Sequence, residues 1–193
     1  MNDESVKRPI IFPGDEFAAK NPMSMGKVIN FIQRAKSVDN QSDYTHTGII
    51  TGANGATLES LWTVKSQNLW DAYKGQKILI VRNIFMTPAV YAAGYARIKK
   101  HIGQWYPFPR LILHVLHVAK WVHWDRLVCS EFTAKFEAGC AEFLDSVVSD
   151  QPADGRVKNS GFMRNWYGVN PDDLTDRWRI SRYYETVFEG VAE

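Results

Sequence analysis

Cysteine is scarce in this chain of 193 residues, which contains only Cys129 and Cys140. Two cysteines do not make a disulfide framework. If residues 129–148 form one continuous helix, the two thiols lie roughly 16 Å apart along it, too far to bridge. Both thiols are therefore expected to be free.

Long apolar runs are also missing. The longest, from Leu111 to Trp124, has about fourteen residues and contains three histidines and a lysine, whereas a membrane-spanning helix needs about twenty. The opening MNDESVKRPI is polar and charged, without the apolar core of a signal peptide. The resulting expectations are no transmembrane segment and a cytoplasmic location.

Charge of one sign is not in excess, because 23 basic residues are mixed with 21 acidic ones for a formal net charge of +2. This balance gives no general reason to expect nucleic acid or an anionic membrane as a partner. A small-molecule or peptide-like substrate stays open. The length suits one domain over residues 1–193.

Residue patterns predict strands and helices that do not alternate regularly. After a turn at Gly14 and Asp15, helical spacing is expected over residues 25–38, and a hairpin is expected over 44–64 around the turn 52–55. The later predicted elements are a strand over 77–84, a helix from Pro88 closed by Gly103, a helix from Cys129 to about Val148, and a turn leading to a terminal strand within 170–189. This order favours an α+β domain with an antiparallel sheet packed against helices.

Cys129 stands at the predicted start of a long helix, in the stretch LVCSEF. A thiol there feels the positive end of the helix dipole and unpaired backbone N–H groups, which favour the thiolate and can stabilise an oxyanion. Cys129 is thus a candidate nucleophile. The competing interpretation is an inert buried cysteine, which is the commoner role of a free thiol.

The predicted hairpin supplies a base and a carboxylate for such a nucleophile. If its turn centres on Ala53 and Asn54, Gly48 faces Glu59, and His46 lies diagonal to Glu59 on the same face. Gly48 leaves room for the glutamate to lean toward the imidazole. His46 would then act as general base and Glu59 would orient it, although either residue alone is more often structural.

Several motifs, in this order along the chain, resemble those of a known family: PGD, YTHTGII, LES, GQWYPF, VCSEF and NPDDL. Together they resemble the circularly permuted papain-like cysteine hydrolases, the YiiX-like branch of the NlpC-type superfamily, over about residues 12 to 177. The resemblance implies a permuted papain-like fold in which the histidine strand and its acidic partner precede the cysteine helix. It also implies Cys129, His46 and Glu59 as catalytic residues.

The resemblance further implies that Tyr106, in GQWYPF, lines the site. Its hydroxyl would donate to the oxyanion, and a buried core tyrosine is the alternative. The expected activity is cleavage of a peptide or isopeptide amide through an acyl-enzyme, with a peptide-like or acylated substrate and no cofactor or metal. A lipid acyltransferase or thioesterase, and a catalytically silent binding protein, are the alternatives.

The segment from Leu111 to Trp124 departs from the family pattern. His114 and His117 have the spacing of metal ligands on a helix, but no carboxylate or cysteine nearby completes a set with them or with His123. An amphipathic core helix is the favoured interpretation. A helix covering the site, or one contacting a lipid interface, is the alternative.

Overall fold

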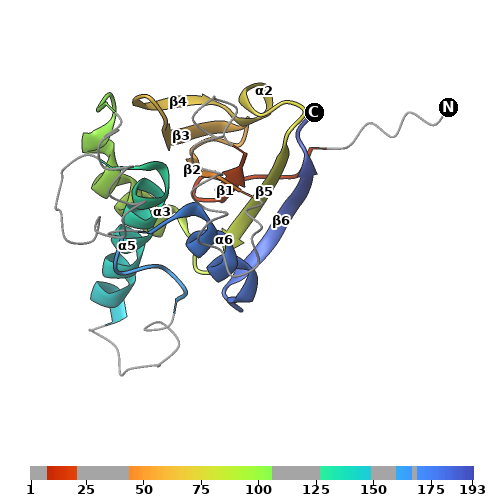
Figure 1. The fold of residues 1–193 in the computed structure, drawn as a ribbon. Coiled ribbons are helices and arrows are strands. Elements are labelled where there is room, and N and C mark those ends of the chain that lie inside the picture. Colours follow the sequence, from red (N-terminus) through yellow and green to blue (C-terminus); the bar gives the residue numbers. More distant parts are fainter. Residues whose placement is uncertain (1–7, 21–43, 106–126, 149–159, 167–168) are drawn as a thin grey trace.

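The computed structural model describes residues 8–20, 44–105, 127–148, 160–166 and 169–193. Its centre is a six-stranded antiparallel sheet with the strand order β4-β3-β2-β1-β5-β6 (Figure 1). The strands are β1 (Glu16–Ala19), β2 (His46–Ile50), β3 (Ala56–Ser60), β4 (Val64–Asn68), β5 (Lys77–Asn83) and β6 (Tyr184–Val191). The helices are α2 (Leu69–Ala72), α3 (Pro88–Ile98), α5 (Cys129–Val148) and α6 (Pro171–Ile180), with a 3-10 turn η1 (Lys99–His101). The predicted α+β class with an antiparallel sheet is confirmed.

The predicted hairpin is present in the predicted register. Ile49 pairs with Leu58 and Ile50 with Thr57, as a turn centred on Ala53 and Asn54 requires. Gly55 closes the turn with a φ of 90°, a left-handed conformation that glycine adopts at little cost. His46 and Glu59 are therefore carried by neighbouring strands in the expected alignment.

The helices predicted from Pro88 and from Cys129 are also confirmed. Thr87 caps α3, since its side chain accepts a hydrogen bond from the Val90 N–H, and Pro88 occupies the first turn. The α-helix ends at Ile98, and η1 continues the chain to Gly103, whose φ is 82°. No helix in the described ranges is both long and apolar enough to cross a membrane.

Two expectations need correction. Residues 171–180 form the helix α6 where a turn was expected, because Asn170 and Asp173 form a capping box and Pro171 starts the first turn. The chain also does not pass directly from the Gly14 turn to a helix, since β1 follows that turn and occupies the middle of the sheet. The helix predicted over residues 25–38 lies outside the described residues.

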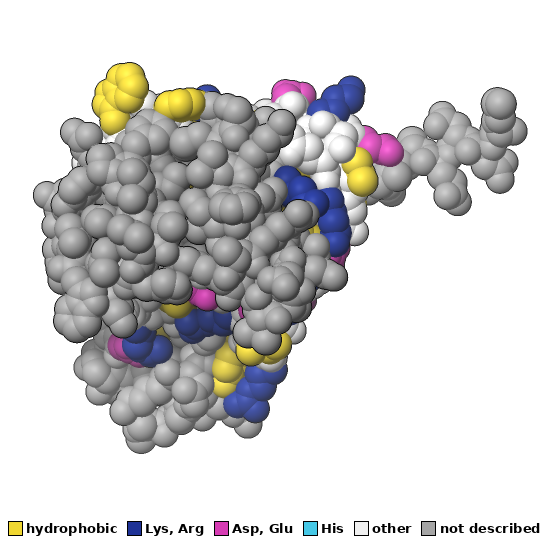
Figure 2. All heavy atoms as spheres, in the orientation of Figure 1, with side chains coloured by type: hydrophobic (Ala, Val, Ile, Leu, Met, Phe, Trp, Pro, Cys, Tyr) yellow, Lys and Arg dark blue, Asp and Glu magenta, His cyan; other side chains and the backbone are white. Residues whose placement is uncertain are grey.

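Both faces of the sheet are covered by apolar side chains. Helices α3 and α5 lie side by side on one face (Figure 1), where Ile49, Leu79 and Phe136 belong to the larger core. The short helix α2 contributes Leu69 and Trp70 to a second core on the other face. Among the described residues, the hydrophobic side chains visible in Figure 2 form small separate groups. Burial on both faces fixes the strand register, and so fixes which side chains of β2 and β3 meet.

One acidic pair is buried between the sheet and α5. Glu137 on α5 accepts hydrogen bonds from Trp178 Nε1 (3.0 Å), from the Tyr184 hydroxyl (3.0 Å) and from the Met163 N–H (2.6 Å). Glu16 on β1 is 1% exposed, and neither of its carboxyl oxygens has a hydrogen-bond partner of normal geometry among the described residues. Burial, followed by repulsion from Glu137, raises the pKa of Glu16 well above its ordinary value. Its buried position therefore favours the neutral form of Glu16.

Candidate active site

His46 and Glu59 form a buried pair at one end of the hairpin. The Nε2 atom of His46 lies 2.7 Å from Oε2 of Glu59, and both residues are completely buried. The predicted register produces this contact, because Gly48, opposite Glu59, has no side chain. A Cβ atom at Gly48 would lie 3.0 Å from the Cβ of Glu59 and 2.6 Å from the Phe17 ring. The predicted diagonal contact is present.

Two further hydroxyl groups hold Glu59 in place. Thr57 Oγ1 donates to Oε1 at 2.5 Å, and the Tyr73 hydroxyl donates to Oε2, the oxygen that also contacts His46. The Tyr73 ring stacks on the imidazole with centroids 6.1 Å apart and an interplanar angle of 21°. Burial opposes ionisation of Glu59, but the hydrogen bonds from His46, Thr57 and Tyr73 outweigh it and lower its pKa. Glu59 is thus an oriented carboxylate.

The start of α5 is anchored on both sides of Cys129. Ser60, at the end of β3, donates to the Leu127 carbonyl at 2.8 Å, and Ser130 donates to the Val169 carbonyl at 2.5 Å. The Val128 N–H points to Glu131 Oε2 at 3.4 Å, as in a capping interaction. These contacts fix the first turn of α5, with Cys129, relative to the sheet that carries His46 and Glu59.

Cys129 lies close enough to His46 to set its protonation. One turn later on α5, Thr133 donates to Thr47, the residue after His46, at 3.2 Å. The Nδ1 atom of His46 is buried without a hydrogen bond of normal geometry to a described residue. Burial alone would lower the pKa of His46, but its interactions with the neighbouring Cys129, and then with Glu59, raise it to about 10. The arrangement therefore favours a charged imidazole at His46, with Nε2 engaged by Glu59 and Nδ1 not used by that contact.

Sequence reasoning identified three members of this cluster and missed two. Thr57 stands two residues before Glu59 on the same strand face, so the period of a strand could have indicated it. Tyr73 follows α2, and no local pattern in the sequence connects it to Glu59. Tyr106 lies outside the described residues, as does the segment from Leu111 to Trp124 with its three histidines. Within the described ranges, no group of three or more His, Cys, Asp or Glu side chains is placed to hold a metal ion.

No protein-family model matches this sequence. A search of curated proteins likewise found no significant match. The geometry of the cluster therefore carries the functional argument.

Replacing Tyr73 by phenylalanine is expected to weaken the carboxylate's support. The hydroxyl lowers the pKa of Glu59, so the stability that Glu59 contributes is present above its ordinary pKa of 4.5 and is lost as the pH falls. In Tyr73→Phe the pKa of Glu59 in the folded protein should lie closer to 4.5, so the loss of stability on acidification should be smaller and should end at a higher pH. The free energy of unfolding near pH 7 should fall by about 1 kcal/mol. Urea unfolding between pH 3 and 7 measures both effects.

Tyr91→Phe is the matched control, since Tyr91 is a half-buried tyrosine on α3 that contacts Tyr95 and Phe136. Between pH 3 and 7, the free energy of unfolding of Tyr91→Phe should change with pH as it does in the unmodified chain. If the free energy of unfolding depends on pH in the same way in both variants, Tyr73 does not support Glu59.

Proposed function

We propose that this protein is a cysteine hydrolase that cleaves an amide bond through Cys129, His46 and Glu59. The observation that carries the proposal is the position of His46, which binds Glu59 through Nε2 and has its pKa raised to about 10 chiefly by Cys129. A nucleophile, a base and an orienting carboxylate thus meet in one buried place. A permuted papain-like fold, with the histidine strand before the cysteine helix, is part of the same proposal.

The thiolate of Cys129 attacks the amide carbon, and N–H groups of the first turn of α5 face the oxyanion that forms, because they have no acceptor within the helix. The imidazolium of His46 then gives its proton to the leaving nitrogen as the C–N bond breaks. The product is a thioester on Cys129 and a free amine. Glu59 stays ionised and keeps the ring oriented throughout.

Deacylation restores the starting pair. Neutral His46 takes a proton from water while the water oxygen attacks the thioester carbon. The C–S bond breaks, the acid product leaves, and Cys129 is again a thiolate beside an imidazolium. The proposed substrate is a peptide or isopeptide amide, because the three residues supply a nucleophile and a proton donor for a poor leaving group.

The pH dependence of thiol alkylation tests this proposal directly. Iodoacetamide should modify Cys129 readily, because the neighbouring imidazole of His46 stays charged up to about pH 10. In His46→Ala the rate at pH 5 to 6 should fall by about tenfold or more, since the stabilising imidazolium is gone. Mass spectrometry of the Cys129 peptide at timed intervals measures the rate.

Cys140 provides the internal control in the same sample. It is fully buried, and burial raises the pKa of its thiol, so it should react slowly in both chains. If Cys129 behaves like Cys140 and ignores His46, the hydrolase proposal fails and the fold would instead serve binding.

A further inference from the structure

A second candidate site lies on the other side of α5, in a groove between α3 and α5. The groove encloses about 660 Å³, within the range of small-molecule sites. Its floor is built from small residues, including Ala93, Ala96 and Gly139. A Cβ at Gly139 would lie 3.0 Å from the Gly94 Cα, so the two helices touch there and the larger side chains stand around the contact.

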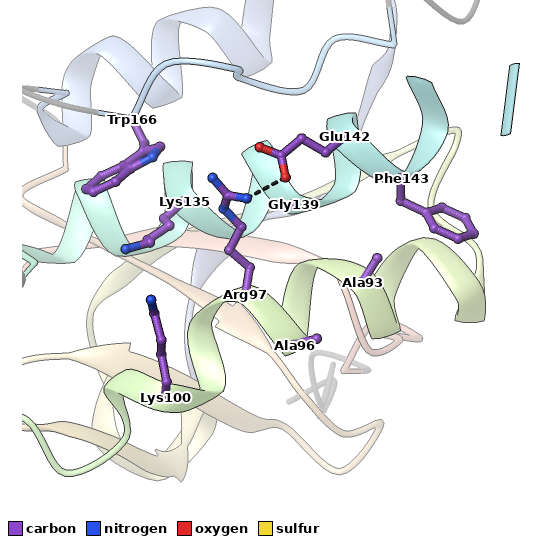
Figure 3. Close-up of a pocket in the computed structure, with 9 residues that line it drawn as sticks. All are labelled: Ala93, Ala96, Arg97, Lys100, Lys135, Gly139, Glu142, Phe143 and Trp166. Atoms are coloured by element: carbon purple, nitrogen blue, oxygen red, sulfur yellow. Dashed lines mark hydrogen bonds and ion pairs between the residues drawn. The ribbon is translucent and has the colours of Figure 1, made fainter. Parts of the chain in front are cut away.

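Basic side chains enter this groove from both walls. Figure 3 shows Lys100, from η1, and Lys135, from α5, extending toward each other, with the guanidinium group of Arg97 beside them. Lys135 is only 8% exposed, and its Nζ lies 4.2 Å from the centroid of the Trp166 ring. A lysine residue buried to this degree is uncommon.

The single carboxylate among the described lining residues, Glu142, is engaged by Arg97 Nη1. The Nε atom of Arg97 is buried and has no hydrogen-bond partner among the described residues. Three cationic side chains and one acidic side chain therefore line the same groove. An oxyanion bound between the cations would accept charge-assisted hydrogen bonds from them.

The rest of the lining is aromatic. Trp166 covers Lys135, and the Phe143 ring stands at the far end of the groove (Figure 3). We propose that this groove binds a phosphomonoester, with the phosphate between Lys100, Lys135 and Arg97 and an apolar or aromatic body against these rings. A dianionic head suits three converging cations better than a single carboxylate does.

The groove is distinct from the proposed active site. Lys135 follows Cys129 by six residues, which corresponds to one and two-thirds turns and about 9 Å along the helix axis. The two side chains therefore leave α5 in different directions, Cys129 toward His46 and Lys135 toward Trp166. Phosphomonoester binding is consequently expected to persist unchanged in Cys129→Ala, which separates this inference from the hydrolase proposal.

Isothermal titration calorimetry with phenyl phosphate, at fixed ionic strength, tests the groove. Phenyl phosphate should bind, while phenol, which lacks the anion, should bind at least about tenfold more weakly. Lys100→Ala should weaken phenyl phosphate binding by about tenfold, whereas Lys99→Ala should not. Lys99 is the matched control because it is the preceding residue, equally exposed and outside the lining. Lys135→Met, which keeps the buried stem and removes the charge, should weaken binding at least as much.

A second arm separates a soluble ligand from a lipid headgroup. Vesicles of phosphatidylcholine with phosphatidic acid are compared with pure phosphatidylcholine vesicles by co-sedimentation. Binding of phenyl phosphate or of phosphatidic acid that is lost in Lys100→Ala supports the site and identifies the source. If neither phenyl phosphate nor phosphatidic acid binds, or if Lys100→Ala and Lys99→Ala have equal effects, the proposed site is overturned. Because Lys100 is exposed, its replacement does not put folding at risk.

Discussion

Replacing Cys129 by alanine is expected to abolish acylation of the protein by p-nitrophenyl acetate. The activated ester needs only a nucleophile and no specific leaving-group recognition, so it reports on the thiolate directly. Loss of the nucleophile of a triad lowers the rate by about a thousandfold or more. Release of p-nitrophenolate and the mass of one acetyl group on the intact chain provide two independent measurements of this loss.

Cys140→Ala is the control for that experiment. Cys140 is the other thiol of the chain and is packed between α3 and α5. Its sulfur lies 3.5 Å from the Val90 carbonyl oxygen, and a Cβ atom added at Gly94 would lie 2.6 Å from it. Its replacement removes a sulfur and should leave acylation within about twofold of the original rate, because it contacts none of the three site residues. Acetylation that survives in Cys129→Ala and disappears in Cys140→Ala would refute the assignment of the nucleophile.

Replacing Glu16 by glutamine is expected to change how stability depends on pH. Because the pKa of Glu16 is raised in the folded state, its carboxyl group releases its proton at a higher pH in the folded protein than in the unfolded chain, where release begins at about pH 4.5. The contribution of Glu16 to the free energy of unfolding is therefore complete below pH 4.5. It declines as the pH rises, by up to about 1.4 kcal/mol per pH unit. Glu16→Gln cannot ionise, and its amide can donate to Glu137, so this decline should be absent and the variant should be more stable than the original chain near pH 6.5.

The window between pH 4.5 and 6.5 isolates this effect. The pKa of His46 is also raised, from 6.5 to about 10, so its own contribution declines only above pH 6.5. Urea unfolding at several pH values within the window measures the slope. Glu185→Gln, at an exposed position on β6, should keep the slope of the original chain. A slope unchanged in Glu16→Gln would mean that Glu16 is already ionised in the folded protein.

The parts of the site that lie close together in sequence were predictable. The contact between His46 and Glu59 follows from a two-strand hairpin, in which the turn residues set the register and Gly48 leaves space for the glutamate. The start of the helix at Cys129 was also predictable, because the helical spacing of apolar residues begins there.

The parts that depend on distant segments were not predictable. Strand β1 is four residues long and owes its place to pairing with β2 and β5, which no local pattern of Glu16–Ala19 reveals. Tyr73 reaches Glu59 only because β4 and α2 turn the chain back over the hairpin. The helix α6 is different, since its capping box and first-turn proline were visible in the sequence and were interpreted as a turn.

The strand order has a consequence for how the protein assembles during folding. Strands β2, β3 and β4 are consecutive neighbours, so the His46 and Glu59 pair closes over a short loop and can form early. Strand β5 must pair with β6 across most of the remaining chain, with Lys77 opposite Val191, and closing that loop is slow. The base and its carboxylate would thus be assembled before the sheet is complete. Reactivity of the thiol would then appear as a late kinetic phase in refolding, after the hairpin has already formed.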